Sequence, residues 1–471
     1  MRNKFTAIWI WLFLVPLALD FKGSEDASSH LAQILLVAPC VGAGCLLLLI
    51  APRFERRSHM RKLVTFGMLA TILGSVVTQQ LQGNDFGNYL RVLLPFMLFL
   101  LGYFVACHPW SDVRLAQIEK ALFWTMVISL VFSFGYGVAT GGGLDKVRFH
   151  IVSVTFLGLQ GVLLHEFVVA RRHPRFALAL FIGTLVIELL SVTRSLLLGT
   201  ALLFILATWL SAPSLRHLLR AATRALVMGM LVAATVAGVA ALMPSVSAHW
   251  IQRISASKET EAGVDPTTIT RLAEIKNQYD QVTSSTSTLL TGEGYGHVYR
   301  YSPSYLPDLQ GQMSAKDFFS IHEWVAGHNF WVYQLFAGGL LFGIGMPLAI
   351  FYALYKAAFA HREWRRHMPN LLYLPVLGRA ILLLAALPAT SIGGNPLGPR
   401  FSGLIFGVAL GLVVATYARI AQTLRVRAAR HVRRPHRAPV MSPTPQWPSG
   451  TLDGHSGVAQ LPHGLHGEAR S

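Results

Sequence analysis

Runs of apolar residues about as long as a lipid bilayer is thick constrain this chain more than any other feature of its sequence. A helix of about 20 apolar residues spans the hydrocarbon core, because helical hydrogen bonding satisfies every backbone group where water is absent. The 471 residues are 53% hydrophobic and only 13% charged, a composition typical of membrane proteins. Apolar runs cover residues 5–20, 31–51, 62–79, 88–108, 118–140, 150–170, 175–193, 195–211, 222–243, 329–355, 371–391 and 402–421. The sequence therefore predicts an all-α polytopic membrane protein with about 12 transmembrane helices.

The basic residues of the short loops predict the orientation of these helices. Cytoplasmic loops are enriched in lysine and arginine. Basic clusters at residues 53–62, 171–175, 216–224 and 362–366 all fall on the side of the amino terminus, whereas residues 79–87 contain no basic residue. We therefore expect the amino terminus to be cytoplasmic. An even number of crossings returns the carboxyl terminus to the same side.

This orientation divides the chain into four parts. Residues 1–243 hold the first nine predicted helices, and residues 244–327 form one large periplasmic loop. Residues 328–421 hold the last three helices, and residues 422–471 form a basic, disordered cytoplasmic tail. The net charge of +18 follows largely from this topology and from attraction to anionic membrane lipids. No nucleic-acid-binding motif accompanies the charge, so we expect no nucleic-acid partner.

Two polar residues stand where the outer ends of helices are expected. His328 opens the helix that follows the large loop, among Trp324, Trp331 and Tyr333. An aromatic belt at the membrane interface is the simplest interpretation of such a group. Arg194, between the seventh and eighth helices, places a positive charge on the outer face against the general bias. Its side chain can snorkel to lipid headgroups, or it can hold a phosphate with a planar fork of donors.

Other charged residues fall within the apolar runs, where an ionised side chain is costly. Arg91 and Glu188 lie at similar inferred depths, which predicts that they form an ion pair, and both are secondary site candidates. Arg379 is a third such charge, with no partner that the sequence identifies. Histidines 322 and 328 do not suit a zinc site on one helix, because residues six apart lie about 240° apart around its axis. The three cysteines have no metal-binding or redox spacing, so we expect no metal.

Several of these features together resemble the bacterial O-antigen ligase and polymerase superfamily. They are the outer-face turn Thr193–Ser195, a large late loop with Arg271 and the glycine-rich turn Gly292–Gly296, and the His328-Asn329 pair that opens the next helix. The resemblance covers roughly residues 180–350. It implies a GT-C-like membrane fold.

The resemblance also implies a metal-independent membrane glycosyltransferase without a cofactor. Such proteins take a glycan from undecaprenyl diphosphate at the periplasmic face of the inner membrane and join it to an acceptor hydroxyl, on lipid A-core or on a growing glycan. Arg194 and Arg271 would bind the diphosphate and stabilise its growing negative charge. His328 would be the general base. Asn329 would orient the histidine or the acceptor, and Glu188 is an alternative acid or base.

The residues distinguish less clearly between the two branches of the superfamily, the ligases and the polymerases. In ligases the His-Asn pair is followed by nine residues, glycine, two residues, and then glycine, threonine or tyrosine; Gly339 fits this pattern, but Phe342 stands at the last position. Arg300 and Gly311 have a spacing often ascribed to polymerases, although 41 glycines make such a match easy by chance. We expect an O-antigen ligase, with a polymerase of O-antigen or exopolysaccharide repeat units as the alternative. A polysaccharide transporter or flippase is the alternative from another class, for which internal symmetry and charges along a central path are expected.

Overall fold

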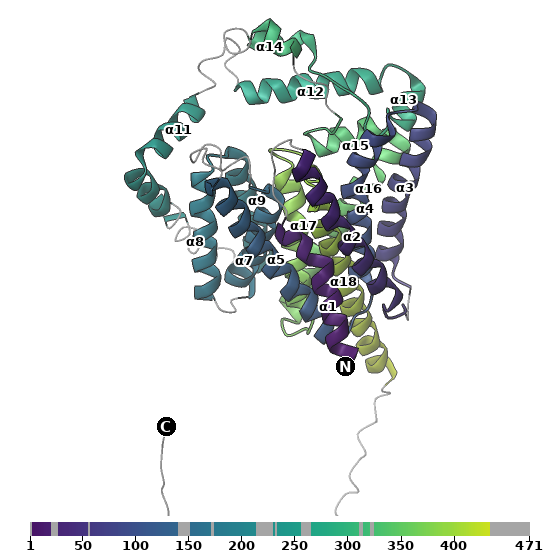
Figure 1. The fold of residues 1–471 in the computed structure, drawn as a ribbon. Helices are drawn as coiled ribbons and strands as arrows, with labels where there is room; N and C mark the ends of the chain where they lie inside the picture. The colour runs from purple at the N-terminus through teal and green to yellow at the C-terminus, as the bar shows by residue number, and fades with distance from the viewer. Residues whose placement is uncertain are drawn as a thin grey trace, which may run out of the picture. The chain divides into compact units, whose positions relative to one another are not determined.

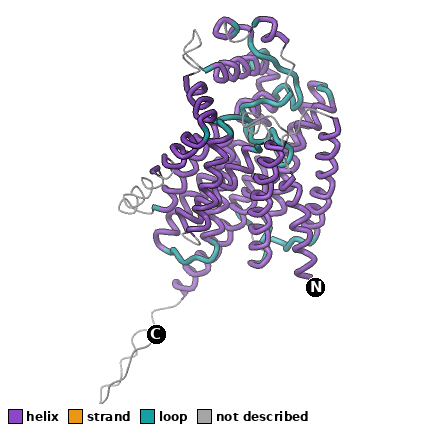
Figure 2. The backbone as a smooth tube through the Cα atoms, turned by 60° about the vertical axis from the view of Figure 1, so that its left-hand side comes forward, coloured by secondary structure: helices purple, strands orange, loops and turns teal. Residues whose placement is uncertain are grey.

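The computed structural model describes most of the chain. It covers residues 2–19, 27–54, 57–139, 151–170, 174–212, 229–230, 233–255, 265–309, 314–320 and 325–433. Contacts divide the chain into two compact units, residues 1–423 and 424–471, and the site lies in the first. Helices dominate, and no strand occurs in the described ranges (Figure 2). The prediction of an all-α protein is confirmed for this part of the chain.

Each apolar run that the structure describes contains a helix (Figure 1). The helices before the large loop are α1 (Arg2–Leu14), α2 (Ala27–Leu49), α3 (His59–Gln82), α4 (Phe86–Cys107), α5 (Asp112–Ala139), α7 (Ser153–Leu164), α8 (Pro174–Leu190) and α9 (Arg194–Ser211). Those of the loop are α11 (Pro244–Ser255), α12 (Pro266–Val282), α13 (Thr286–Thr291) and α14 (Ala315–Ser320). Those after it are α15 (Phe330–Gly338), α16 (Gly345–His367), α17 (Leu374–Thr390) and α18 (Ser402–Arg433).

Local sequence signals explain where a long helix such as α3 begins and ends. At its start, the Ser58 side chain accepts a hydrogen bond from the backbone N–H of Arg61, which satisfies one of the donors that a helix leaves open. At its end, Gly83 takes the left-handed conformation with φ of 64°. The apolar run thus becomes a helix with defined ends.

Six helical segments in the described part of the chain are long and apolar enough to cross a membrane. They are α3, α4, α5, Ser153–Ala170, α9 and Ser402–Arg427. Two bent pairs of helices raise the number to eight if each pair is one span. These findings support a membrane protein with several long apolar helices.

The predicted twelve spans and the GT-C-like architecture are not supported. α1 has 13 residues and α17 has 17, whereas a helix needs about 20 residues to cross the hydrocarbon core. The run at 329–355 is broken into α15 and α16, which are bent by 89°. Of the run at 222–243, residues 229–230 and 233–243 are described, and the helix Ala233–Leu242 is bent by 114° from Pro244–Gln252.

Small residues allow α18 to pack closely against α4. Glycines 403, 407 and 411 recur every four residues along α18, so they share one face. A Cβ on Gly411 would lie 2.7 Å from the carbonyl oxygen of Tyr103, and a Cβ on Gly102 of α4 would lie 2.8 Å from that of Leu404. Backbones can approach this closely only without side chains between them, as in many membrane helix pairs.

Arg379, for which the sequence identified no partner, lies in a cluster of ion pairs. Its Nε and Nη2 are 2.7 and 2.9 Å from the two carboxylate oxygens of Glu119, and its Nη1 is 2.8 Å from Glu166. His165 Nδ1 lies 3.1 Å from the same Glu166 oxygen. The two carboxylates compensate the arginine, which gives Arg379 a structural role between α17, α5 and the turn that follows α7.

The large loop is folded into helices at one end of the bundle (Figures 1 and 2). Ile269 of α12 and Phe318 of α14 form a small core with the side chains of Tyr301, Tyr305 and Leu306. Trp250 of α11 donates a hydrogen bond from Nε1 to the carbonyl oxygen of Leu189 at 2.8 Å. In the same region α12 packs against α15, so the loop and the membrane helices share an interface.

The last helix, α18, extends into the region predicted to be the tail. α18 continues to Arg433, past the predicted boundary at residue 421. The extension includes four arginines and two alanines, residue types that favour helix even where the apolar run has ended. The disorder predicted for the rest of the tail concerns residues 434–471, which lie outside the described residues.

Candidate active site

A strained turn places Arg194 at the start of α9. Val192 has φ of +47°, a left-handed conformation that β-branched residues rarely adopt. Thr193 occupies the N-cap position and Arg194 is the first residue of the helix. The Arg194 guanidinium pairs with Asp265, with Nη2 2.6 Å from Oδ1. Strain of this kind persists where surrounding structure over-determines the backbone, and it is often found at functional sites.

α12 contributes one cation and one anion to the site. Arg271 and Glu274 are three residues apart, so they lie on the same side of the helix. Arg271 Nη1 is 3.3 Å from Glu274 Oε2. The Arg271 side chain is 34% exposed and that of Glu274 only 2% exposed, so the guanidinium can meet a ligand while the carboxylate faces inward.

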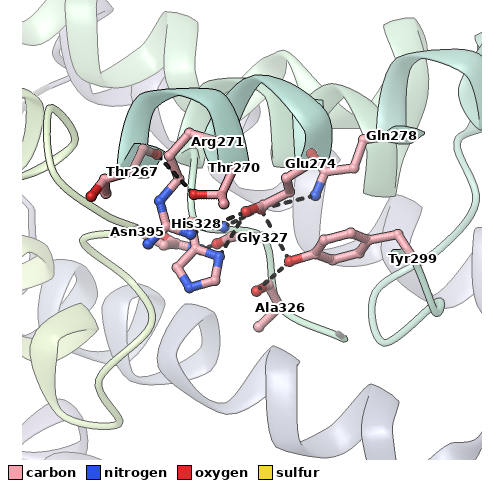
Figure 3. Close-up of polar contacts among 10 residues, drawn as sticks. All are labelled: Thr267, Thr270, Arg271, Glu274, Gln278, Tyr299, Ala326, Gly327, His328 and Asn395. Carbon is pink, nitrogen blue, oxygen red and sulfur yellow. Dashed lines mark hydrogen bonds and ion pairs between the residues drawn. The ribbon is translucent and has the colours of Figure 1, made fainter. Parts of the chain in front are cut away.

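The Glu274 carboxylate is the centre of a hydrogen-bond network (Figure 3). The backbone N–H of His328 donates to Oε1 at 2.7 Å, and His328 Nδ1 lies 2.7 Å from Oε2. The hydroxyl of Tyr299 lies 3.1 Å from Oε1, and Gln278 Nε2 is 3.4 Å from the same atom. Because one carboxylate holds both the backbone and the ring of His328, the orientation of the imidazole is fixed.

The surroundings of Glu274 favour its ionised form. Burial raises its pKa, but the hydrogen bonds and the charge of His328, with the nearby charge of Arg271, outweigh burial and hold the pKa of Glu274 below its usual value. Burial and the neighbouring carboxylate also raise the pKa of Tyr299, so its hydroxyl keeps its proton. That hydroxyl lies 2.9 Å from the carbonyl oxygen of Ala326 as well.

An ionised Glu274 determines the tautomer of neutral His328. A carboxylate only accepts hydrogen bonds, so Nδ1 must carry the ring proton and Nε2 must carry the lone pair. The His328 side chain is 27% exposed, which leaves the ring accessible beside its buried partner. A histidine oriented by a carboxylate in this way is a recurring form of general base.

Asn329 fixes the backbone next to His328 by capping the helix that follows it. Its side-chain oxygen accepts hydrogen bonds from the backbone N–H groups of Trp331 at 3.1 Å and Val332 at 3.2 Å, so Asn329 is the N-cap of α15. On the other side of His328, the carbonyl oxygen of Gly327 accepts from Asn395 Nδ2 at 2.8 Å. Asn329 therefore contacts the helix that follows, while Glu274 holds the imidazole.

The glycine-rich turn Gly292–Gly296 anchors the loop to the end of α15. Its three glycines all have positive φ, between 80° and 92°. The N–H groups of its second and third residues donate to the carbonyl oxygens of Phe336 at 2.8 Å and Ala337 at 3.0 Å. Gly339 has φ of +59°, and a Cβ there would lie 2.5 Å from the carbonyl group of Leu290. These glycines let two backbones meet directly beside the site.

Phe342, which departs from the ligase pattern, lies in the π-helical turn Gly339–Gly343 between α15 and α16. Its ring packs against Gly74 of α3, where a Cβ would collide with the aromatic side chain. The structure thus accommodates a large residue at this position through a glycine on the facing helix. Phe342 does not line the cavity described next.

Arg194, Arg271, His328 and Asn329 all line a single cavity of about 990 Å³. Its wall also includes Asp265 and residues of α7, of the first turn of α12 and of the loop that follows α17. The sequence-predicted primary residues, which come from distant parts of the chain, are therefore brought together. The cavity combines two guanidinium groups, which can bind an anionic substrate, with a carboxylate-oriented imidazole, which can accept a proton.

The two secondary candidates lie away from this cavity, and the ion pair predicted between them is wrong. Glu188 is buried in α8, where Gln160 Nε2 is 2.9 Å and Thr200 Oγ1 is 3.0 Å from its carboxylate. Arg91 is exposed on α4. Polar groups of α7 and α9 satisfy Glu188, which is why it does not need the arginine. Neither Glu188 nor Arg91 lines the cavity.

Sequence reasoning missed two carboxylates of the site, Glu274 and Asp265. A signal for Glu274 was its position one turn after Arg271 on a polar helix, where both side chains share a face. Asp265 directly precedes Pro266, a typical helix start, and nothing in that pattern points to Arg194. Three residues considered in the sequence, His322, Trp324 and Gly311, lie outside the described residues.

Comparison with known proteins adds no relative: no family model matches the chain, and no curated protein matches it.

Proposed function

We propose that the chain is a membrane glycosyltransferase that moves a glycan from undecaprenyl diphosphate to an acceptor hydroxyl at the periplasmic face of the bacterial inner membrane. The preferred acceptor is lipid A-core, which makes the protein an O-antigen ligase. One observation carries the proposal: α9, α12 and the start of α15 bring Arg194, Arg271 and His328 to one cavity. The motif resemblance described above supports the same assignment.

The two arginines suit the leaving group of this reaction. Negative charge grows on the diphosphate as the glycosidic bond breaks, and preorganised guanidinium groups stabilise such charge well where water is partly excluded. The side chains of Arg194 and Arg271 are 36% and 34% exposed, so both are accessible to a ligand and partly shielded from bulk water. In this proposal, no metal is needed to neutralise the diphosphate.

His328 and Glu274 suit the acceptor side of the reaction. The acceptor oxygen forms a bond to the anomeric carbon, and the bond between that carbon and the diphosphate oxygen breaks. The acceptor proton passes to His328 Nε2, while undecaprenyl diphosphate leaves with the electron pair. Glu274 stabilises the resulting imidazolium through its 2.7 Å contact with Nδ1. The histidine then returns its proton to water.

The proposed reaction can be tested with purified protein, a radiolabelled undecaprenyl-diphosphate glycan and lipid A-core. We expect transfer of label to the acceptor, and a loss of about a hundredfold or more in His328→Ala, because general base catalysis contributes about that much. Arg194→Lys and Arg271→Lys should also be impaired, since an ammonium cannot make bidentate phosphate contacts. Lys276→Gln is the matched control, because Lys276 is an exposed cation of α12 paired with Asp280 and does not line the cavity.

Two results would contradict the proposal. Normal transfer by His328→Ala would exclude the histidine as general base. Movement of labelled glycolipid across a vesicle membrane, with no consumption of the donor bond, would indicate the transporter alternative instead.

Deletion of the gene distinguishes a ligase from a polymerase. Both reactions use the same arginines and histidine, but they leave different intermediates. For a ligase, we expect long undecaprenyl-linked chains that are made but not attached to lipid A-core. Accumulation of single repeat units, on the core or on the carrier, would identify the protein as the polymerase.

A further inference from the structure

A carboxylate of the same chain pairs with the guanidinium group to which the proposed function assigns phosphate binding. Asp265 Oδ1 lies 2.6 Å from Arg194 Nη2, and both residues line the cavity. The Asp265 side chain is 13% exposed and that of Arg194 is 36% exposed. A phosphate that binds Arg194 must therefore compete with an anion of the same chain.

Asp265 also lies next to N–H groups of the first turn of α12, which are alternative hydrogen-bond partners for its side chain. It occupies the N-cap position of α12, followed by a proline at the first helical position. Its backbone carbonyl already accepts from the N–H groups of Thr268 at 2.8 Å and Ile269 at 3.1 Å. Aspartate is among the best N-cap residues, because its side chain accepts from N–H groups of the first turn. Here that side chain makes no such hydrogen bond.

We propose that Asp265 exchanges partners when the donor diphosphate binds. Phosphate oxygens take the Arg194 guanidinium, and the Asp265 carboxylate turns to cap the first turn of α12. A partly exposed ion pair is weak and is readily exchanged for bidentate phosphate contacts. The cap gives the displaced carboxylate hydrogen bonds, so it is not left uncompensated. This inference rests on the proposed function, because it takes a lipid diphosphate as the ligand.

The exchange links ligand binding to the helix that carries the rest of the site. α12 supplies Arg271 and Glu274. Capping of its first turn by Asp265 would restrain the amino-terminal end of this helix only while the anion is bound. The geometry thus points to a donor site that becomes more ordered as it fills.

Binding of undecaprenyl diphosphate to the purified full chain in nanodiscs tests the competition. We expect Asp265→Ser to lower Kd about fivefold, because serine can cap the helix but cannot compete as an anion for the arginine. Arg194→Ala should lose most of the binding. Asp280→Asn, which removes an exposed carboxylate paired with Lys276 on the same helix, should leave Kd unchanged.

Hydrogen exchange of a peptide covering residues 265–272 tests the new cap. In the natural chain, undecaprenyl diphosphate should increase protection of this peptide, and in Asp265→Ala the increase should be absent. Equal protection in both would show that the ligand itself caps α12 and would overturn the exchange.

The binding data separate the two proposals. An unchanged Kd in Asp265→Ser overturns the exchange, whereas loss of binding in Arg194→Ala in the same series still supports the proposed function. Full binding by Arg194→Ala would contradict the phosphate role of this residue, and the exchange with it.

Discussion

At the level of single residues, the contact between His328 Nδ1 and Glu274 Oε2 determines what the histidine can do. Glutamine at position 274 can present either an amide N–H or a carbonyl oxygen to the ring, so it no longer selects the tautomer with the lone pair on Nε2. We expect Glu274→Gln to lower kcat about a hundredfold with a smaller change in KM, because the base is misoriented rather than the donor released. Steady-state transfer assays measure both constants. An unchanged kcat would contradict the positioning role.

The same contact predicts how stability depends on pH. The pKa of Glu274 in the folded chain lies below its usual value. In the unfolded chain, the pKa of a glutamate is about 4.3. The ionised carboxylate therefore stabilises the fold above the unfolded value, and this contribution is lost as the pH falls through the lower folded value. We expect the melting temperature of the natural chain to exceed that of Glu274→Gln at pH 7, and this difference to shrink as the pH falls below about 4.3. A difference in melting temperature that grows as the pH falls would contradict this prediction.

Residue types and positions singled out Arg194 and His328, and the family resemblance added Arg271; all three line the cavity. They were not enough to find Glu274, which lies 54 positions before its partner His328. Its helix also carries Asp280, a carboxylate that pairs with Lys276 on the exposed side. Helical periodicity says which residues share a face, and it does not say which face meets a histidine far along the chain.

At the level of elements, the junction of α15 with the glycine-rich turn holds the site together. Gly339→Ala should strain the backbone, since φ is +59° and the added Cβ would lie 2.5 Å from the Leu290 carbonyl group. We expect a loss of stability of about 1–3 kcal/mol. Thermal unfolding in detergent measures it. Gly183→Ala in α8 is the control, because nothing lies within 4 Å of the added Cβ, and it should be neutral or slightly stabilising. Equal stability of the two variants would show that the fold does not depend on a glycine at position 339.

Apolar runs predicted the helices well, because burial in lipid or protein selects hydrophobic segments whatever their tertiary partners. They predicted the breaks poorly. The run at 329–355 is continuous in hydrophobicity, and its π-helical turn at Gly339–Gly343 begins where the backbone of Gly339 meets that of Leu290 and Gly292. Such a break depends on a contact with a segment outside the run, so hydrophobicity alone cannot reveal it.

At the level of the whole molecule, orientation in the membrane is the prediction on which the proposed function depends. The distribution of basic residues among the loops predicts that residues 244–327 are periplasmic. In a variant without Cys40, Cys45 and Cys107, a cysteine introduced at the exposed position 300 should react with an impermeant maleimide in intact spheroplasts. A cysteine at position 366, in a basic cluster, should react only after the cells are opened. Labelling of position 300 solely in opened cells would reverse the topology.

The exposure of the two arginines has a pharmacological consequence under the proposed orientation. About a third of each guanidinium side chain is open in a cavity of about 990 Å³, a volume in the range of drug-sized ligand sites. A dianionic compound that bridges Arg194 and Arg271 would meet its target outside the cytoplasm. It would need to pass only the outer membrane, so the low permeability of the inner membrane to charged molecules would not limit its action.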